Sequence, residues 1–170
     1  MNAFKAIRNN IPNTITCLNL FAGAMACVFA LKGNEPVGNL TSYQVAFIFI
    51  VLAAMFDFCD GLVARLLNSV SPIGKELDSL SDCVSFGLAP AMLLYAAMEH
   101  FNPGDVANYS AFLIAVFGAL RLAKFNVDTT QTTTFKGLPI PANAIFWLGY
   151  VNMCYERDSM NFAVYLLILA

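Results

Sequence analysis

This chain has very little charge. Of its 170 residues only 12% are Asp, Glu, Lys or Arg, whereas 59% are apolar. A soluble domain carries roughly one quarter charged residues. The deficit therefore predicts a single integral membrane domain over residues 1–170. The sequence also has no basic run of the kind that marks a nucleic-acid surface, so we expect no nucleic-acid partner.

Paired cysteines are missing as well. The five cysteines are scattered singly, without the spacing of a zinc site or a disulfide framework. We interpret them as free thiols that pack as small apolar residues. Cys59 and Cys83 stand beside aspartates, but a thiolate is a soft ligand and suits a different metal from the hard cations that carboxylates prefer.

Long apolar runs occupy most of the chain. No charge occurs between Arg8 and Lys32, a run long enough to span a bilayer of roughly 30 Å. Its polar start and the later spans favour a retained helix over a secretory signal, although residues 24–26 are small enough for cleavage. Further spans are predicted at about residues 43–67, 75–98, 106–125 and 138–155, with loops at 32–42 and 126–137.

Residues 160–170 are apolar but too few to cross a membrane, and we expect them to be the start of a truncated sixth helix. The predicted fold is therefore an all-α integral membrane protein, a bundle of about six transmembrane helices. No internal repeat supports an inverted-repeat transporter.

Basic residues predict the orientation of this bundle. With a cytoplasmic N-terminus, seven of the nine Lys and Arg residues fall on the cytoplasmic side, and only Lys32 and Arg157 fall outside. The seven are Lys5, Arg8, Arg65, Lys75, Arg121, Lys124 and Lys136. We therefore expect a cytoplasmic N-terminus.

Four aspartates interrupt the apolar pattern within residues 57–82. At about 100° per residue, the first group shares a helical arc of roughly 140°. This group is Asp57, Asp60, Gly61, Ala64 and Arg65. A second group repeats every four residues and so lies on one face of a following helix. It consists of Gly74, Asp78 and Asp82, and Ser71-Pro72 marks the turn between the two helices.

Two helices joined in this way would direct four carboxylates into one space. Carboxylates at such density repel one another in a poorly hydrated place, and divalent cations with a preference for oxygen, Mg²⁺ or Mn²⁺, are the simplest compensation. Two such ions form a clamp for phosphoryl transfer. Gly61, Ala64 and Gly74 leave room for a bulky group beside the cations, and Arg65 could neutralise phosphate charge. The simpler interpretation, in which Asp57 and Asp60 pair with Arg65 and Lys75, accounts for only one or two of the aspartates.

The pattern Asp57-x2-Asp60-Gly61-x2-Ala64-Arg65-x8-Gly74-x3-Asp78-x3-Asp82 resembles, without a departure, the motif of the CDP-alcohol phosphotransferases. Eight fixed positions at fixed spacing make the resemblance specific. Four further segments are similar to the serine-using subgroup, the membrane-embedded bacterial phosphatidylserine synthases: residues 11–16, 79–90, 121–126 and 135–139.

The resemblance implies roles for individual residues. Asp57, Asp60, Asp78 and Asp82 would bind two divalent cations, Mg²⁺ or Mn²⁺, with Asp82 also the general base. The cytidine diphosphate part would be bound by Asn13, Thr16, Gly61, Ala64, Arg65 and Gly74.

The resemblance also implies the reaction and its setting. CDP-diacylglycerol and L-serine would be the substrates, and phosphatidylserine and CMP the products. Arg121 and Lys136 are the cationic residues expected at the serine carboxylate, although both would equally serve as positive-inside anchors. The enzyme would be a homodimer surrounded by membrane lipids, in the bacterial inner membrane with its site facing the cytoplasm.

Two alternatives stay open at this stage. The acceptor could be glycerol 3-phosphate, an inositol phosphate or an amino alcohol, although a phosphorylated acceptor should need a denser cationic pocket. A divalent-cation transporter would use the aspartates as transit ligands. It is disfavoured because the acids gather at one face and because a cation path gains nothing from Arg65.

Overall fold

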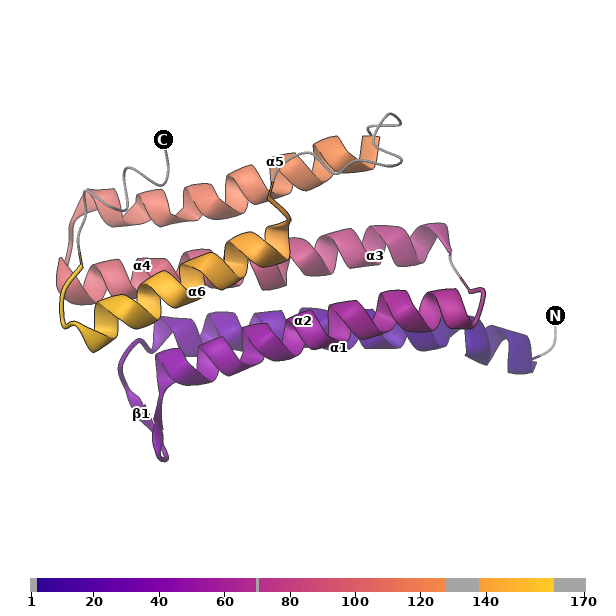
Figure 1. Ribbon diagram of the computed structural model, residues 1–170, viewed down its shortest axis with the longest axis horizontal. Helices are drawn as coiled ribbons and strands as arrows, with labels where there is room; N and C mark the ends of the chain where they lie inside the picture. The colour runs from indigo at the N-terminus through magenta and orange to yellow at the C-terminus, as the bar shows by residue number, and fades with distance from the viewer. Residues whose placement is uncertain (1–2, 70, 128–137, 161–170) are drawn as a thin grey trace.

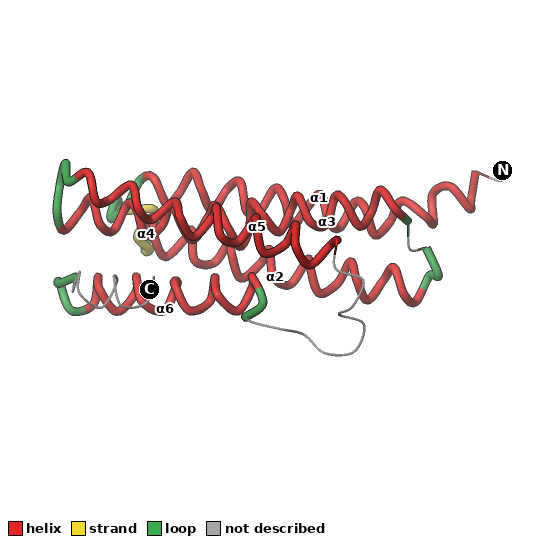
Figure 2. The backbone as a smooth tube through the Cα atoms, turned by 90° about the horizontal axis from the view of Figure 1, so that it is seen from above, coloured by secondary structure: helices red, strands yellow, loops and turns green. Residues whose placement is uncertain are grey.

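The computed structural model describes residues 3–69, 71–127 and 138–160, and these form long helices lying roughly side by side (Figures 1 and 2). The helices are α1 (Ala3–Leu31), α2 (Ser42–Leu66), α3 (Pro72–Asp82), the π-helical segment η1 (Cys83–Leu88), α4 (Ala89–Phe101), the 3-10 segment η2 (Val106–Phe112), α5 (Leu113–Val127) and α6 (Ile140–Glu156). The segments α3, η1 and α4 follow one another without a break and form the third long helix. The predicted all-α architecture is thus confirmed for the described residues.

Four helical stretches in the described ranges are long and apolar enough to cross a membrane: Asn10–Leu31, Ser42–Leu66, Pro72–Phe101 and Val106–Val127. They correspond to the first four predicted spans. The predicted fifth span is α6, a helix of 17 residues. The expected sixth helix falls almost wholly on residues 161–170, outside the described part of the chain. Six spans and a cytoplasmic N-terminus therefore stay predictions.

Local sequence signals explain where the two site helices begin. Gln44 at the start of α2 accepts a hydrogen bond from the backbone N–H of Thr41 through Oε1, at 3.0 Å. Ser71 caps α3 by accepting a hydrogen bond from the Gly74 N–H at 3.1 Å. Pro72 occupies the first turn of α3, where its missing N–H costs nothing. The predicted break between the helices is therefore confirmed.

The predicted loop over residues 32–42 contains a short hairpin that sequence reasoning missed. Strands β1 (Pro36–Val37) and β2 (Leu40–Thr41) pair antiparallel, with Val37 opposite Leu40. Gly38 lies in the left-handed region at φ +63°, which glycine adopts without steric cost. Strands of two residues each carry no periodicity that a sequence pattern could reveal.

Small side chains allow α1 to pack closely against its neighbours. Ala22, Ala26 and Ala30 recur every four residues on α1 and are buried, as are Ala46 and Ala53 on α2. Such stripes let helix backbones approach closely in membrane proteins, where van der Waals packing replaces the hydrophobic effect between helices. The tight pairing of α1 with α2 positions the polar half of α2.

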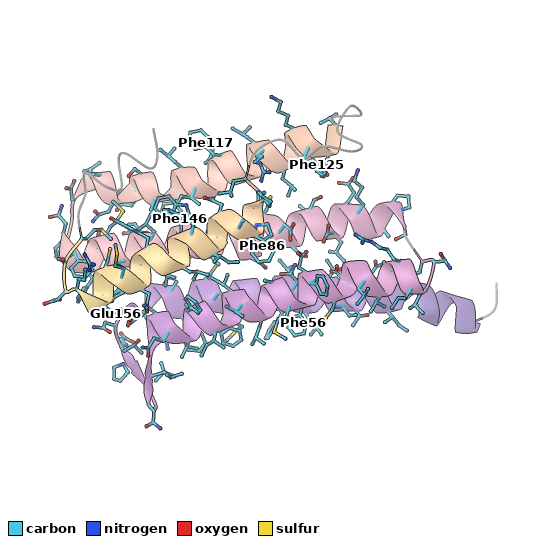
Figure 3. The ribbon with its side chains drawn as sticks, viewed as in Figure 1. Phe56, Phe86, Phe117, Phe125, Phe146 and Glu156 are labelled. Carbon is cyan, nitrogen blue, oxygen red and sulfur yellow. The ribbon has the colours of Figure 1, made fainter. Side chains whose placement is uncertain are left out.

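Large apolar side chains lie both inside and outside the bundle. Phe86 is 1% exposed and lies between the helices, whereas Phe117 is 54% exposed on the outer face of α5 (Figure 3). Met55 and Phe58 on α2 are exposed as well. An outward apolar surface of this kind suits a protein surrounded by lipid.

Candidate active site

Three carboxylates meet between α2 and α3. One oxygen atom each from Asp57, Asp60 and Asp78 lies within 4.8 Å of the other two. Asp57 and Asp60 project from α2 and Asp78 from α3, as the 3–4 spacing predicts. Neither Arg65 nor Lys75 is a partner of these carboxyl groups in the described part of the chain. The interpretation that ion pairs alone account for Asp57 and Asp60 is therefore wrong.

Asp82 lies beside this triplet rather than within it. Its carboxyl group adjoins that of Asp57, and its Oδ1 atom is buried without a hydrogen-bond partner among the described residues. A buried carboxylate oxygen without a partner is costly, and a bound cation is one way to satisfy it. The donors of all four side chains are hard oxygen atoms, so the residues fit Mg²⁺ or Mn²⁺.

A cavity of about 560 Å³ opens beside the three carboxylates. This volume is in the range of small-molecule sites. All six residues expected at the nucleotide line it together with Asp57, Asp60 and Asp78; they are Asn13, Thr16, Gly61, Ala64, Arg65 and Gly74. The structure thus brings residues of α1, α2 and α3 to one space. The segments of α2 and α3 that line it lie toward the end of the bundle where α1 begins (Figure 1).

The two glycines of the cavity differ in what surrounds them. A Cβ atom at Gly61 would meet no atom within 4 Å, so this position leaves open space for a ligand. A Cβ atom at Gly74 would lie 2.9 Å from Asn13 Oδ1 and 3.0 Å from Ser71 Oγ. Glycine at position 74 therefore allows the Asn13 amide to approach the start of α3.

Sequence reasoning missed three polar residues of the cavity. Lys75, Ser69 and Ser71 also line it, and the buried Ser69 hydroxyl has no hydrogen-bond partner within the described ranges. All three flank the turn between the aspartate-bearing helices. The sequence signal that could have identified them is their position next to the predicted turn at Ser71-Pro72. Lys75 adds a second positive charge to the cavity beside Arg65.

Of the two residues expected at serine, the structure describes only Arg121. Arg121 is partly buried on α5 and does not line the cavity, and Lys136 lies outside the described residues. The end of α5 is nevertheless tied to α3, because Asn126 Nδ2 donates a hydrogen bond of 2.8 Å to Ser79 Oγ. Ser79 directly follows Asp78, so the last turn of α5 lies close to the site.

The chain is similar in sequence to a known protein family and to several named relatives. The family described as CDP-alcohol phosphatidyltransferase matches residues 9–170. A relative from Bacillus subtilis (strain 168), named CDP-diacylglycerol–serine O-phosphatidyltransferase, is 39% identical over 133 residues, covering 78% of this chain and 70% of the relative. Relatives of the same name from Methanocaldococcus jannaschii and Saccharomyces cerevisiae are 39% and 40% identical and cover 84% and 95% of this chain.

The chain spans only 61% and 62% of the length of those last two relatives. An archaetidylserine synthase from Methanothermobacter thermautotrophicus is 37% identical over 137 residues. No solved structure was found that matches the chain.

Proposed function

The chain belongs to the CDP-alcohol phosphatidyltransferase family, and on that premise we propose that it transfers the phosphatidyl group of CDP-diacylglycerol to L-serine, giving phosphatidylserine and CMP. The observation that carries this proposal is the meeting of Asp57, Asp60 and Asp78 at one cavity with the small residues of the motif. The names of the relatives support serine as the acceptor.

Asp57, Asp60, Asp78 and Asp82 are the residues that would hold two divalent cations. Bound there, the cations would supply charge stabilisation for the phosphoryl oxygens and for the departing CMP. The chain itself contributes the arrangement of the carboxylates on two helices, which keeps their oxygen atoms close together despite their mutual repulsion.

The cytidine diphosphate part occupies the cavity in this proposal. Gly61 leaves space beside α2, and the Asn13 amide stands at the start of α3, where it can bond a polar group of the nucleotide. Arg65 and Lys75 both line the cavity and are exposed, so their cationic groups can reach phosphate oxygens.

Asp82 serves as the general base. The serine hydroxyl is a poor nucleophile until its proton is removed. As the serine oxygen forms its bond to the lipid-linked phosphorus, the bond from that phosphorus to the oxygen of CMP breaks, and the hydroxyl proton passes to the Asp82 carboxylate. The Asp82 Oδ1 atom has no hydrogen-bond partner among the described residues, which supports a role for this carboxylate in the reaction.

The acceptor pocket and the molecular setting are further parts of the proposal. In this proposal Arg121 and Lys136 bind the carboxylate of serine. The hydrogen bond from Asn126 to Ser79 supports this assignment, because it ties the end of α5 to the helix that carries Asp78. We place the site at the cytoplasmic face of a bacterial inner membrane, in a homodimer surrounded by lipid.

Release of CMP from CDP-diacylglycerol tests the reaction. The purified protein is incubated with Mn²⁺ or Mg²⁺ and with serine, glycerol 3-phosphate or inositol phosphate, each added singly. We expect metal-dependent release with serine alone. Release with another acceptor only would contradict the serine assignment while keeping the reaction class. A protein that releases no CMP with any acceptor, yet conducts divalent cations in liposomes, would be a carrier.

A further inference from the structure

Helix α1 holds the two aspartate-bearing helices in place. It packs along both α2 and α3, whereas the backbones of α2 and α3 approach each other at few positions within the described residues. The carboxylates between α2 and α3 repel one another, which tends to separate these two helices. The spacing of the aspartates therefore depends on how α1 contacts each helix.

Thr16 on α1 contacts both α2 and α3. Its hydroxyl Oγ1 lies 2.5 Å from Asp60 Oδ2 on α2. Its carbonyl oxygen lies 3.3 Å from Ser81 Oγ on α3, whose single proton is shared with the Leu77 carbonyl at 2.8 Å. Thr16 is 3% exposed, Asp60 6% and Ser81 0%, so these groups are largely shielded from water. The Thr16 hydroxyl is also 3.1 Å from Pro12 O, but the shorter contact to a carboxylate is the stronger one.

The same face of α1 fixes the register of the third long helix. Ser81 directly precedes Asp82, and one turn later Ser85 Oγ donates to the carbonyl of Asn19 at 3.1 Å. A Cβ atom at Gly23 would lie 2.7 Å from the Cα atom of Ser85, so the two backbones are already in close contact there. Asp82 is thus held between two serine hydroxyls that face α1.

We propose that Thr16 is a positioning residue for the metal site, acting through Asp60 and Ser81, and that it is not a nucleotide contact. This inference rests on the proposed function only in taking the aspartates to bind divalent cations. Groups that orient metal ligands typically change metal affinity 10- to 100-fold when they are lost. A buried hydroxyl already committed to Asp60 has no further proton to offer a phosphate oxygen of the nucleotide.

Mn²⁺ binding to the purified full chain, followed by electron paramagnetic resonance, tests the proposal without needing turnover. Thr16→Val keeps the side-chain shape but removes the hydroxyl, and we expect its Mn²⁺ affinity to fall about 10- to 100-fold. Thr16→Ser should restore the affinity. The matched control is Thr14→Val, since Thr14 is exposed on the same helix and its hydroxyl donates to the Asn10 carbonyl of that helix.

A second measurement separates the two roles of Thr16. At saturating Mn²⁺ we expect the KM for CDP-diacylglycerol to be unchanged in Thr16→Val. Wild-type Mn²⁺ affinity in this variant would overturn the proposal, and a raised KM at unchanged Mn²⁺ affinity would make Thr16 a nucleotide contact. If Thr16→Val fails to fold, Ser81→Ala removes the link to α3 instead, and its Mn²⁺ affinity should also fall; no change would again overturn the proposal.

Experiments on the wild-type protein distinguish failure of the proposed function from failure of the role proposed for Thr16. A wild-type protein that binds Mn²⁺ but releases no CMP with serine would contradict the reaction while leaving the positioning role of Thr16 intact. A wild-type protein that binds no Mn²⁺ would contradict both.

Discussion

At the scale of single residues, Asp78 and Asp82 stand one helical turn apart yet meet different surroundings. Asp78 belongs to the triplet that faces the cavity, whereas Asp82 adjoins Asp57 with a buried oxygen that has no partner. The difference in position suits a difference in role. A ligand that faces the nucleotide should affect binding and turnover together, whereas a general base should affect turnover alone.

Substitution of each aspartate by asparagine tests this division. We expect Asp82→Asn to lower kcat for CMP release by about 100-fold or more while CDP binding, measured by calorimetry, is largely kept. Asp78→Asn should weaken both. Glu76→Gln is the control, because Glu76 is exposed on the same helix. Near-normal turnover in Asp82→Asn would contradict the general-base assignment.

At the scale of helices, α1 crosses η1 at Gly23, which has the closest backbone neighbour of any glycine in the described part of the chain. A π-helical segment begins directly after Asp82 and contains Ser85, against which Gly23 packs. π-Helical turns within α-helices are often found at functional sites. The extra residue in this turn sets how α3, with its aspartates, continues into the apolar α4.

Gly23→Ala should destabilise the protein by about 1–3 kcal/mol, because the added methyl group collides with the backbone of Ser85. Without that collision, the higher helix propensity of alanine would stabilise the helix by up to about 1 kcal/mol relative to glycine. Gly149→Ala isolates that gain, since a Cβ atom at Gly149 on α6 meets no atom within 4 Å. Thermal unfolding in detergent measures both. A Gly23→Ala protein as stable as Gly149→Ala would show that the crossing can relax.

At the scale of the whole molecule, the polar residues of the site gather at one end of the helix bundle. The turn from α2 into α3, whose residues line the cavity, lies at the end where α1 begins, while the hairpin and the turn after α4 lie at the other end (Figure 1). Arg65, Lys75 and Lys124 belong to elements that end or begin on the cavity side. By the positive-inside rule this end should face the cytoplasm.

Labelling of single cysteines in intact cells tests that orientation. In a background without the five native cysteines, Glu76→Cys should be protected from a membrane-impermeant maleimide and Pro103→Cys should react. Both positions are exposed, one near the cavity end and one in the turn after α4. Permeabilised cells, in which both should react, supply the control. The reverse pattern would place the cavity outside.

The sequence by itself determined the helices and the grouping of the aspartates. Apolar length located the first four spans, Ser71-Pro72 located the turn, and the 3–4 spacing put Asp57, Asp60 and Asp78 on facing helical surfaces. These features follow from local geometry, namely the rise and twist of a helix and the backbone limits of proline. Their catalytic and binding roles are still proposals.

Only the tertiary structure decided how the site is held together. The two contacts of Thr16, the position of Asp82 beside Asp57 and the approach of Gly23 to Ser85 join residues more than 20 positions apart. The cavity residue Lys75 and the hydrogen bond from Asn126 to Ser79 are further cases. Such contacts depend on the distance and rotation between helices, which side-chain packing sets and which helical periodicity leaves undetermined.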